Sequence, residues 1–167
     1  IQNALPAYRG IGPIRSDDGG RTWVSEPSVP SLAGFAFYQI AVDPADQEHC
    51  VAATTNGLYE RVPSVAGFVW EQRQTGSHTS VIATHAGGVT QWFAAAMGDR
   101  VYSSTTGNTW ATIGTGFPTS GVGRIALGVE TDQQHSRTLP GRQVGDFAHR
   151  LGQRRHHGRA DVRALRE

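Results

Sequence analysis

The chain has 167 residues, enough for one domain with a hydrophobic core, and its 38% hydrophobic content excludes a disordered chain. A formal net charge of +1 gives no reason to expect nucleic acid or an anionic membrane as a partner. The 21 glycines and eight prolines predict short strands joined by tight turns rather than helices, because both residue types punctuate turns.

The first predicted element is a tight turn that begins at Ser16 and ends at Trp23. The Asp18 carboxylate is expected to accept hydrogen bonds from backbone amides of its own turn, and the Ser16 and Thr22 hydroxyls to satisfy further backbone groups. Gly20 supplies a backbone angle that other residues avoid. Trp23 is expected to start a strand and to bury about 200 Å² between sheets.

The next predicted elements are three strands, over residues 35–43, 50–54 and 57–62. In the first of them Tyr38, Ile40 and Val42 alternate with smaller or polar neighbours, which is the period of a half-buried strand. The dipeptides Asp43-Pro44 and Asn56-Gly57 are typical of turns and follow the first two strands. This part of the chain therefore predicts an antiparallel meander.

A weaker copy of the turn follows, in which only Gly67 and Trp70 keep the Gly-x-x-Trp register. Three more strands are predicted after it, over residues 80–84, 92–97 and 100–103. The three tryptophans of the repeat, at 23, 70 and 110, are 47 and 40 residues apart.

The third copy of the turn keeps serine, glycine, threonine and tryptophan at the spacing of the first copy, as Ser103, Gly107, Thr109 and Trp110. Thr105 stands where the first copy has its aspartate.

A four-stranded unit of this length, repeated in tandem, indicates the blade of a β-propeller, whose sheet must stack on its neighbours. The predicted units are the later strands of one blade, two whole blades and the opening strand of a fourth, at residues 1–28, 33–75, 78–114 and 123–130. Closed propellers have about four to eight blades. We therefore expect residues 1–131 to form an all-β, partial propeller of four-stranded antiparallel blades, which further blades or another chain would close.

The segment from Ser16 to Trp23 resembles the Asp-box, or BNR repeat, of sialidases and related β-propellers, and the resemblance extends over about residues 8–130. The runs Ile40–Pro44 and Thr55–Tyr59 are also similar to blades of xyloglucanase-like glycosidases, sortilin-type receptor domains and photosystem assembly factors. The resemblance implies that the turn lies on the propeller rim, away from the central site, and it favours an extracytoplasmic location. Asp18 is then structural rather than catalytic.

Sialidase-like hydrolysis would need an arginine cluster, a tyrosine nucleophile assisted by a glutamate, and a general acid. Xyloglucanase-like hydrolysis would need two carboxylates on opposite sides of the scissile bond. The residues available for these roles are Arg9, Arg15, Arg61, Arg73, Arg100, Arg124, Tyr8, Tyr38, Tyr59, Tyr102, Asp43, Asp99, Glu60 and Glu71. No motif fixes a role for any of them, and turns account for Asp43 and Asp99.

His78 and His85 flank a predicted strand, but their spacing is not typical of metal ligands, and we expect neither a metal nor a cofactor. The sequence favours a non-catalytic propeller module that binds or scaffolds a protein or glycan partner. The alternative is a fragment of a sialidase-like or xyloglucanase-like glycoside hydrolase, in which case this chain alone should not turn over glycosides.

The blade pattern stops near Asp132, and residues 132–167 carry eight arginines against four acidic residues. Three interpretations stay open for this irregular basic tail: a disordered segment, an arm that binds anions or nucleic acid, or a stretch read in the wrong frame. The single cysteine, Cys50, excludes an internal disulfide. Neither a signal peptide nor a membrane span is predicted, and Ile1 in place of methionine favours a trimmed chain.

Overall fold

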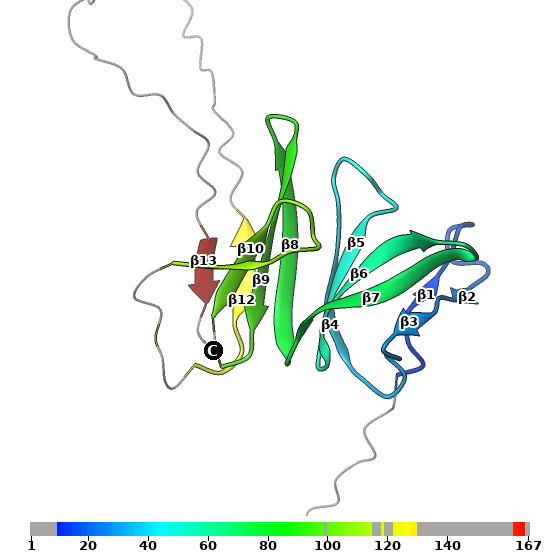
Figure 1. Cartoon of the computed structure of the whole chain (residues 1–167), viewed down its shortest axis with the longest axis horizontal. Coiled ribbons are helices and arrows are strands. Elements are labelled where there is room, and N and C mark those ends of the chain that lie inside the picture. Colours follow the sequence, from blue (N-terminus) through cyan, green and yellow to red (C-terminus); the bar gives the residue numbers. More distant parts are fainter. Residues whose placement is uncertain (1–9, 99, 115–117, 119–121, 130–161, 166–167) are drawn as a thin grey trace, which may run out of the picture.

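The computed structural model describes residues 10–98, 100–114, 118, 122–129 and 162–165. These residues form strands and turns (Figure 1), which confirms the predicted all-β class for this part of the protein. No helix in this part has the length and apolarity that crossing a bilayer requires.

The largest sheet, sheet 1, has five strands in the order β3-β7-β6-β5-β4. Its strands are β3 (Ser28–Val29), β4 (Phe37–Val42), β5 (Cys50–Thr54), β6 (Gly57–Ser64) and β7 (Gly67–Thr75). Strands β4 to β7 form an antiparallel meander, and β3 pairs in parallel with β7. The predicted strand 50–54 coincides with β5, whereas β6 runs two residues past its predicted end.

The second sheet, sheet 2, is a four-stranded antiparallel meander in the order β11-β10-β9-β8. Its strands are β8 (His78–Ala86), β9 (Val89–Ala96), β10 (Val101–Ser104) and β11 (Ala111–Ile113). Strands β8 and β9 are longer than predicted because their pairing continues to a hairpin turn at Gly87 and Gly88. Each of the two predicted whole units, 33–75 and 78–114, thus contains one four-stranded meander.

Two short sheets lie at opposite ends of this pair (Figure 1). One pairs β1 (Ile14–Arg15) with β2 (Val24–Ser25), and the other pairs β12 (Ala126–Val129) with β13 (Val162–Leu165). The prediction of an irregular tail after residue 132 is wrong for β13. Four residues are too short a stretch for an alternation pattern to be recognised in sequence. Residues 132–161, 166 and 167 of the predicted tail lie outside the described residues.

The sheets stack in series, face against face. Strand β8 packs on β4 and β5 of sheet 1, and β12 packs on β8 and β9 of sheet 2. Sheet 2 therefore has neighbours on both faces, and its central strand β9 is buried on both. In β9, Trp92 and Ala94 face sheet 1, while Ala95 faces β12.

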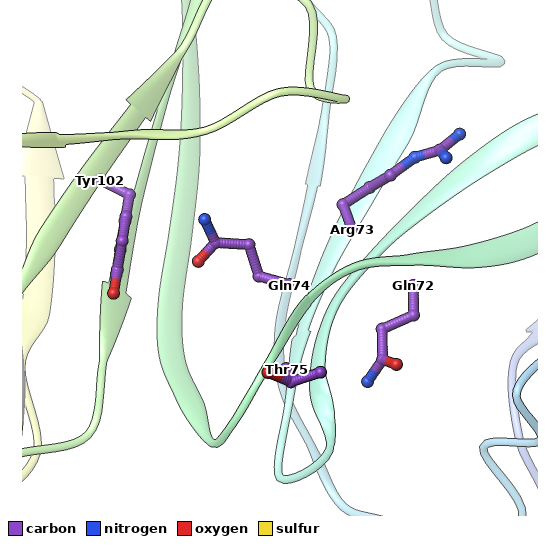
Figure 2. A pocket seen from close by; sticks show the side chains of 5 residues that line it. All are labelled: Gln72, Arg73, Gln74, Thr75 and Tyr102. Carbon is purple, nitrogen blue, oxygen red and sulfur yellow. The ribbon is translucent and has the colours of Figure 1, made fainter.

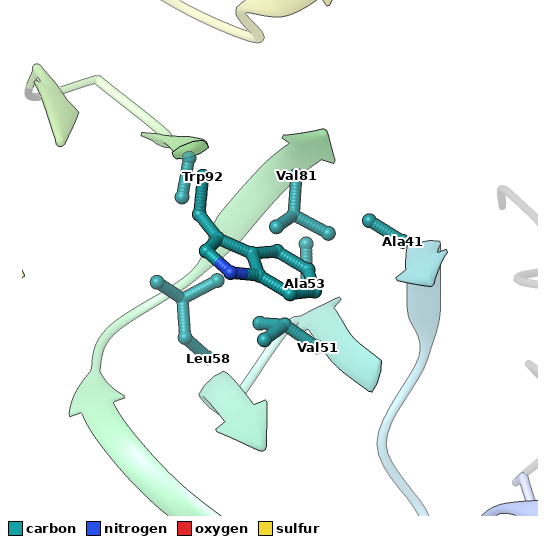
Figure 3. Packing of buried hydrophobic residues seen from close by; sticks show 7 residues of the cluster. Ala41, Val51, Ala53, Leu58, Val81 and Trp92 are labelled. Carbon is teal, nitrogen blue, oxygen red and sulfur yellow. The ribbon is translucent and has the colours of Figure 1, made fainter. Parts of the chain in front are cut away.

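The core between the two large sheets is centred on Trp92, which has no exposed surface. Figure 3 shows its indole over side chains of β4, β5, β6 and β8, namely Ala41, Val51, Ala53, Leu58 and Val81. Small alanines beside one large ring allow the two sheets to approach closely.

The three tryptophans of the repeat belong to three different sheets, each in the last hairpin of its sheet. Trp70 is buried in sheet 1, and Trp110 packs partly buried against the core of Trp92. The expectation that Trp23 is buried between sheets is wrong, because its side chain is 58% exposed. No described sheet covers the face of the β1–β2 hairpin on which it lies.

Candidate functional site

The first turn is closed by oxygen atoms of its own side chains. Asp18 Oδ1 accepts hydrogen bonds from the backbone N–H groups of Arg21 and Thr22, both at 2.9 Å. Ser16 Oγ accepts from the Gly20 N–H at 2.7 Å and donates to Asp18 Oδ1 at 2.9 Å. The Thr22 hydroxyl donates to Asp18 Oδ2 at 2.7 Å, so it binds the carboxylate rather than a backbone group.

These hydrogen bonds favour the charged form of Asp18. The hydroxyl and backbone N–H of Thr22, with the hydroxyl of Ser16, lower the pKa of Asp18 to about 2. A carboxyl group with so low a pKa cannot act as a general acid near neutral pH. The geometry therefore agrees with a structural role for Asp18.

The glycine and tryptophan of the motif are linked by an indole hydrogen bond. Trp23 Nε1 donates to the Gly20 carbonyl at 3.1 Å, and Trp110 Nε1 donates to the Gly107 carbonyl at 2.8 Å. Both glycines have left-handed backbones, with φ of 88° and 76°, which other residues rarely adopt. The recurring Gly-x-Thr-Trp spacing thus encodes a turn that the indole locks.

The third copy of the turn uses different hydroxyl acceptors from those that the sequence indicated. Ser104 Oγ accepts from the Thr106 N–H at 3.1 Å, and Thr106 Oγ1 accepts from the Thr109 N–H at 3.4 Å. Alignment on the tryptophans assigns these roles to Ser103 and Thr105, one residue earlier. In this copy a serine and a threonine hydroxyl, each one residue nearer to the tryptophan, accept the backbone N–H groups that Ser16 and Asp18 accept in the first copy.

The middle copy does not form this turn. Gly67 opens β7, and Trp70 lies inside that strand after a two-residue hairpin turn. Trp70 Nε1 donates to Glu26 Oε2 at 2.7 Å instead of to the carbonyl of Gly67.

A hydrogen-bonded network, the His49 network, joins the two large sheets. His49 lies between two carboxylates, with Nε2 2.9 Å from Glu60 Oε1 and Nδ1 3.3 Å from Asp43 Oδ2. Glu60 Oε2 also accepts from Arg73 Nε at 2.5 Å. From sheet 2, the Thr90 hydroxyl donates to Asp43 Oδ1 at 2.7 Å. Asp43 therefore links the sheets in addition to ending β4.

The third turn packs directly against the His49 network. A Cβ atom added to Gly107 would lie 2.9 Å from His49 Nε2, so this glycine is needed for the close approach as well as for its backbone angle. The imidazole of His49 also meets the Trp92 indole edge-on, with ring centroids 5.0 Å apart. His49 is thereby held in one orientation.

The His49 network makes stability depend on pH. The hydrogen bond to Glu60, with the charges of Glu60 and Asp43, raises the pKa of His49 above its ordinary 6.5. A raised folded-state pKa contributes stability that is complete below the unfolded pKa and is lost as pH rises through the folded pKa. We expect the free energy of unfolding, measured by urea titration, to fall as the pH rises above about 6.5, the ordinary pKa of histidine.

The matched variants for this pH test are His49→Gln and His85→Gln. His49→Gln should flatten the pH dependence of the unfolding free energy over that range, because glutamine does not titrate. His85 is exposed and contacts the Thr90 hydroxyl but neither Asp43 nor Glu60, so His85→Gln should keep the fall. An unchanged profile in His49→Gln would contradict the assignment.

A second charged cluster surrounds Arg61, whose side chain is only 4% exposed. Arg61 Nε and Nη2 donate to Glu26, and Nη1 donates to Glu48 Oε2 at 2.6 Å. The guanidinium carbon lies 3.5 Å from the ring centroid of Phe68. Burial opposes ionisation of Glu26, but hydrogen bonds from Arg61 and Trp70 outweigh it and lower the pKa of Glu26.

An open groove of about 410 Å³ lies between β7 and β10. Its lining consists of Gln72, Arg73, Gln74 and Thr75 from β7 and Tyr102 from β10. Figure 2 shows the Gln74 amide extending toward Tyr102, while the Arg73 guanidinium points away from it. The groove thus presents amides, a hydroxyl and a phenol ring, and no carboxylate is part of its lining.

A β-bulge shapes the β7 side of this groove. Gln72 pairs with Tyr59 and Gln74 pairs with Leu58, which leaves Arg73 as the extra residue. A bulge bends its strand and redirects side chains. Here Arg73 is directed to Glu60 of the His49 network, and Gln74 is left to line the groove.

The structure brings only some of the predicted catalytic candidates together. Arg15 and Arg61 both lie against Phe68 and Glu26, where carboxylates neutralise them. Tyr59 is fully buried, and burial raises the pKa of its hydroxyl. The candidates Arg9, Tyr8 and Asp99 lie outside the described residues.

The two histidines that the sequence analysis considered as metal ligands, His78 and His85, make separate contacts. His85 Nδ1 lies 2.9 Å from the Thr90 hydroxyl, and His78 Nδ1 lies 3.0 Å from the Gly76 carbonyl. Among the described residues, no cluster of three or more histidine, cysteine or acidic side chains is arranged to hold a metal ion.

Sequence reasoning missed His49, Glu26 and the two groove glutamines. His49 and Glu26 lie in connecting segments without a motif, and their partners are distant in sequence. The alternation of Gln72 and Gln74 in a long strand was the one available signal, and it resembles that of any solvated strand face.

No known protein family matches the chain, and no curated protein or solved structure is significantly similar to it.

Proposed function

We propose that this chain is part of an Asp-box β-propeller that binds a glycan without cleaving it, through the groove between β7 and β10. The propeller assignment is supported by the serial stacking of four-stranded meanders and by the two turns locked by tryptophan. The observation that carries the binding function is the lining of the groove, which combines polar side chains with one aromatic ring.

The chemistry of this lining fits a sugar better than an apolar ligand. Pockets for drug-like molecules are mostly apolar and enclosed, whereas this groove is open and mostly polar. The Gln74 amide offers donors and an acceptor, which suits vicinal hydroxyl groups, whereas Gln72 Nε2 already donates to the Asn56 carbonyl at 2.6 Å. Tyr102 supplies an amphipathic ring against which the apolar face of a sugar can pack.

The hydrolase alternative is not favoured by the acidic residues. A glycosidase needs a general acid whose pKa is raised. Among the described residues, every carboxyl group with a shifted pKa has it lowered instead: Asp18, Glu26, Asp43, Glu48 and Glu60. Arginine partners or hydroxyl donors hold these groups in the charged form.

A glycan array followed by NMR titration of the best-bound sugar tests the proposal. Tyr102→Ala should weaken binding about tenfold, the loss expected when an aromatic packing surface is removed. Gln74→Ala should weaken it about threefold to tenfold through lost hydrogen bonds. The control is Gln47→Ala, an exposed glutamine outside the groove, which should bind like the parent chain.

Two results would contradict this proposal. Binding that is unchanged in both Tyr102→Ala and Gln74→Ala would remove the groove as the site. Release of fluorophore from fluorogenic sialosides or β-glucans by this chain would favour the hydrolase alternative.

A further inference from the structure

Strand β4 exposes an apolar stripe on one face. Tyr38, Ile40 and Val42 are 38%, 49% and 47% exposed, while Ala41 between them is buried against sheet 2. Contiguous exposed apolar side chains of this kind mark interaction surfaces. We call Tyr38, Ile40 and Val42 the β4 stripe.

The stacking of the other sheets indicates what covers the β4 stripe. Strand β8 packs on the first two strands of sheet 1, and β12 packs in the same way on the first two strands of sheet 2. Each first strand therefore rests on the two inner strands of the preceding unit. Strand β4 is also a first strand, but among the described residues no inner strands precede it.

The two ends of the stack carry complementary halves of a sheet. The β1–β2 hairpin holds the first turn in the position that the third turn has in β10–β11, so it corresponds to an outer pair of strands. The β12–β13 pair contains a first strand with its neighbour, so it corresponds to an inner pair. An inner and an outer pair together make one four-stranded unit.

We propose that two copies of this chain associate head to tail, with β12–β13 of each copy covering the β4 stripe of the other and pairing with its β1. This inference rests on the propeller assignment made above. The described residues of each copy then contribute two whole sheets and two halves, which amount to three units. Two copies give six units, within the four to eight of closed propellers, whereas one copy gives too few and three copies too many. A closed pair of this kind has twofold symmetry.

The same association accounts for the other exposed apolar side chains at this end. Ile14, Trp23 and Val24 on the β1–β2 hairpin are 46%, 58% and 67% exposed. A composite sheet stacked between two others would cover a tryptophan at this place, as the core covers Trp110 in sheet 2.

Sedimentation velocity of the full chain, at up to about 100 µM, tests the association at concentrations above the Kd of micromolar complexes. We expect a species of about twice the 17.9 kDa chain mass. Val42→Glu should give a monomer, because a carboxylate would enter an apolar interface. Its matched control is Val89→Glu, since Val89 is also on a strand and is 53% exposed, and that variant should still dimerise.

A variant at the other end separates head-to-tail association from a dimer that joins two β4 stripes. Gly128 in β12 is exposed, and an added Cβ would meet no atom within 4 Å, so Gly128→Glu should fold normally. In a head-to-tail ring this variant is also monomeric. If circular dichroism shows that Val42→Glu is unfolded, Tyr38→Arg replaces it with the same expected result.

Two results would overturn the proposal. One is a monomeric parent chain, which is the result expected if a preceding segment of a longer protein covers the β4 stripe. The other is a dimer that survives Gly128→Glu. Neither result changes the expected sugar binding by Tyr102, so the glycan-binding proposal and the dimer proposal can be rejected independently.

Discussion

Replacing Trp92 by alanine should lower the free energy of unfolding by about 3–5 kcal/mol, the usual cost of truncating a large buried aromatic residue. Trp92 is fully buried at the contact between the two large sheets, in a cluster with six smaller buried side chains. Because domains of this size are stable by only about 5–15 kcal/mol, the change should remove a large part of the total stability. Urea titration followed by circular dichroism measures the loss.

The control for this prediction is Trp92→Phe. The indole Nε1 of Trp92 is buried and has no hydrogen-bond partner among the described residues, so its polar atom adds nothing to stability. Phenylalanine keeps most of the apolar volume and removes the unpaired donor. Its cost should therefore be about 1–2 kcal/mol, well below that of alanine. Equal losses in both variants would mean that ring packing is not what joins the sheets.

Local patterns in the sequence account for much of the fold. Strands β4 to β6 and β8 to β10 were predicted, with approximate ends, from short β-branched and aromatic runs between turn residues, and β5 was predicted to the residue. Such prediction succeeds because strand period and turn chemistry depend on neighbours along the chain. The short strands β3 and β13 were not predicted, since two to four residues contain no period.

The candidate site was less predictable because its contacts join segments distant in sequence. The His49 network takes Thr90 from sheet 2, and the groove places Tyr102 opposite a bulge at Arg73. A bulge shifts register without leaving a clear sequence signal. The exposure of Trp23 was also missed, because burial depends on which sheets are present beside a hairpin.

The buried carboxylates of the His49 network and of the Arg61 cluster are all held in the charged form by hydrogen bonds. Asp43, Glu60 and Glu26 each accept hydrogen bonds from groups on other segments, and these bonds outweigh the effect of burial on their pKa. Each carboxylate thereby joins a loop to a sheet or one sheet to another. Among the described residues, these carboxylates therefore hold packed segments together, and none of them lines the groove between β7 and β10.

Glu26→Ala should lower the free energy of unfolding by about 3–5 kcal/mol, because the buried guanidinium of Arg61 then loses its buried carboxylate partner. Arg61 is 4% exposed and Glu26 is 10% exposed, and Glu26 also accepts from the Trp70 indole. Glu48 provides a matched control, since it binds the same guanidinium but is 53% exposed. Solvent can replace the Glu48 carboxylate, so Glu48→Ala should leave the urea midpoint close to that of the parent chain.

The double variant Glu26→Leu with Arg61→Met decides whether the cost comes from the stranded charge or from lost packing. Replacing both members of a buried ion pair by apolar residues of similar volume is often neutral or stabilising. We therefore expect the double variant to recover most of the stability that Glu26→Ala loses, less about 1–3 kcal/mol for the Trp70 indole left without its acceptor. A double variant as unstable as Glu26→Ala would show that the cluster stabilises the sheet through its hydrogen bonds and not merely by avoiding an unpaired charge.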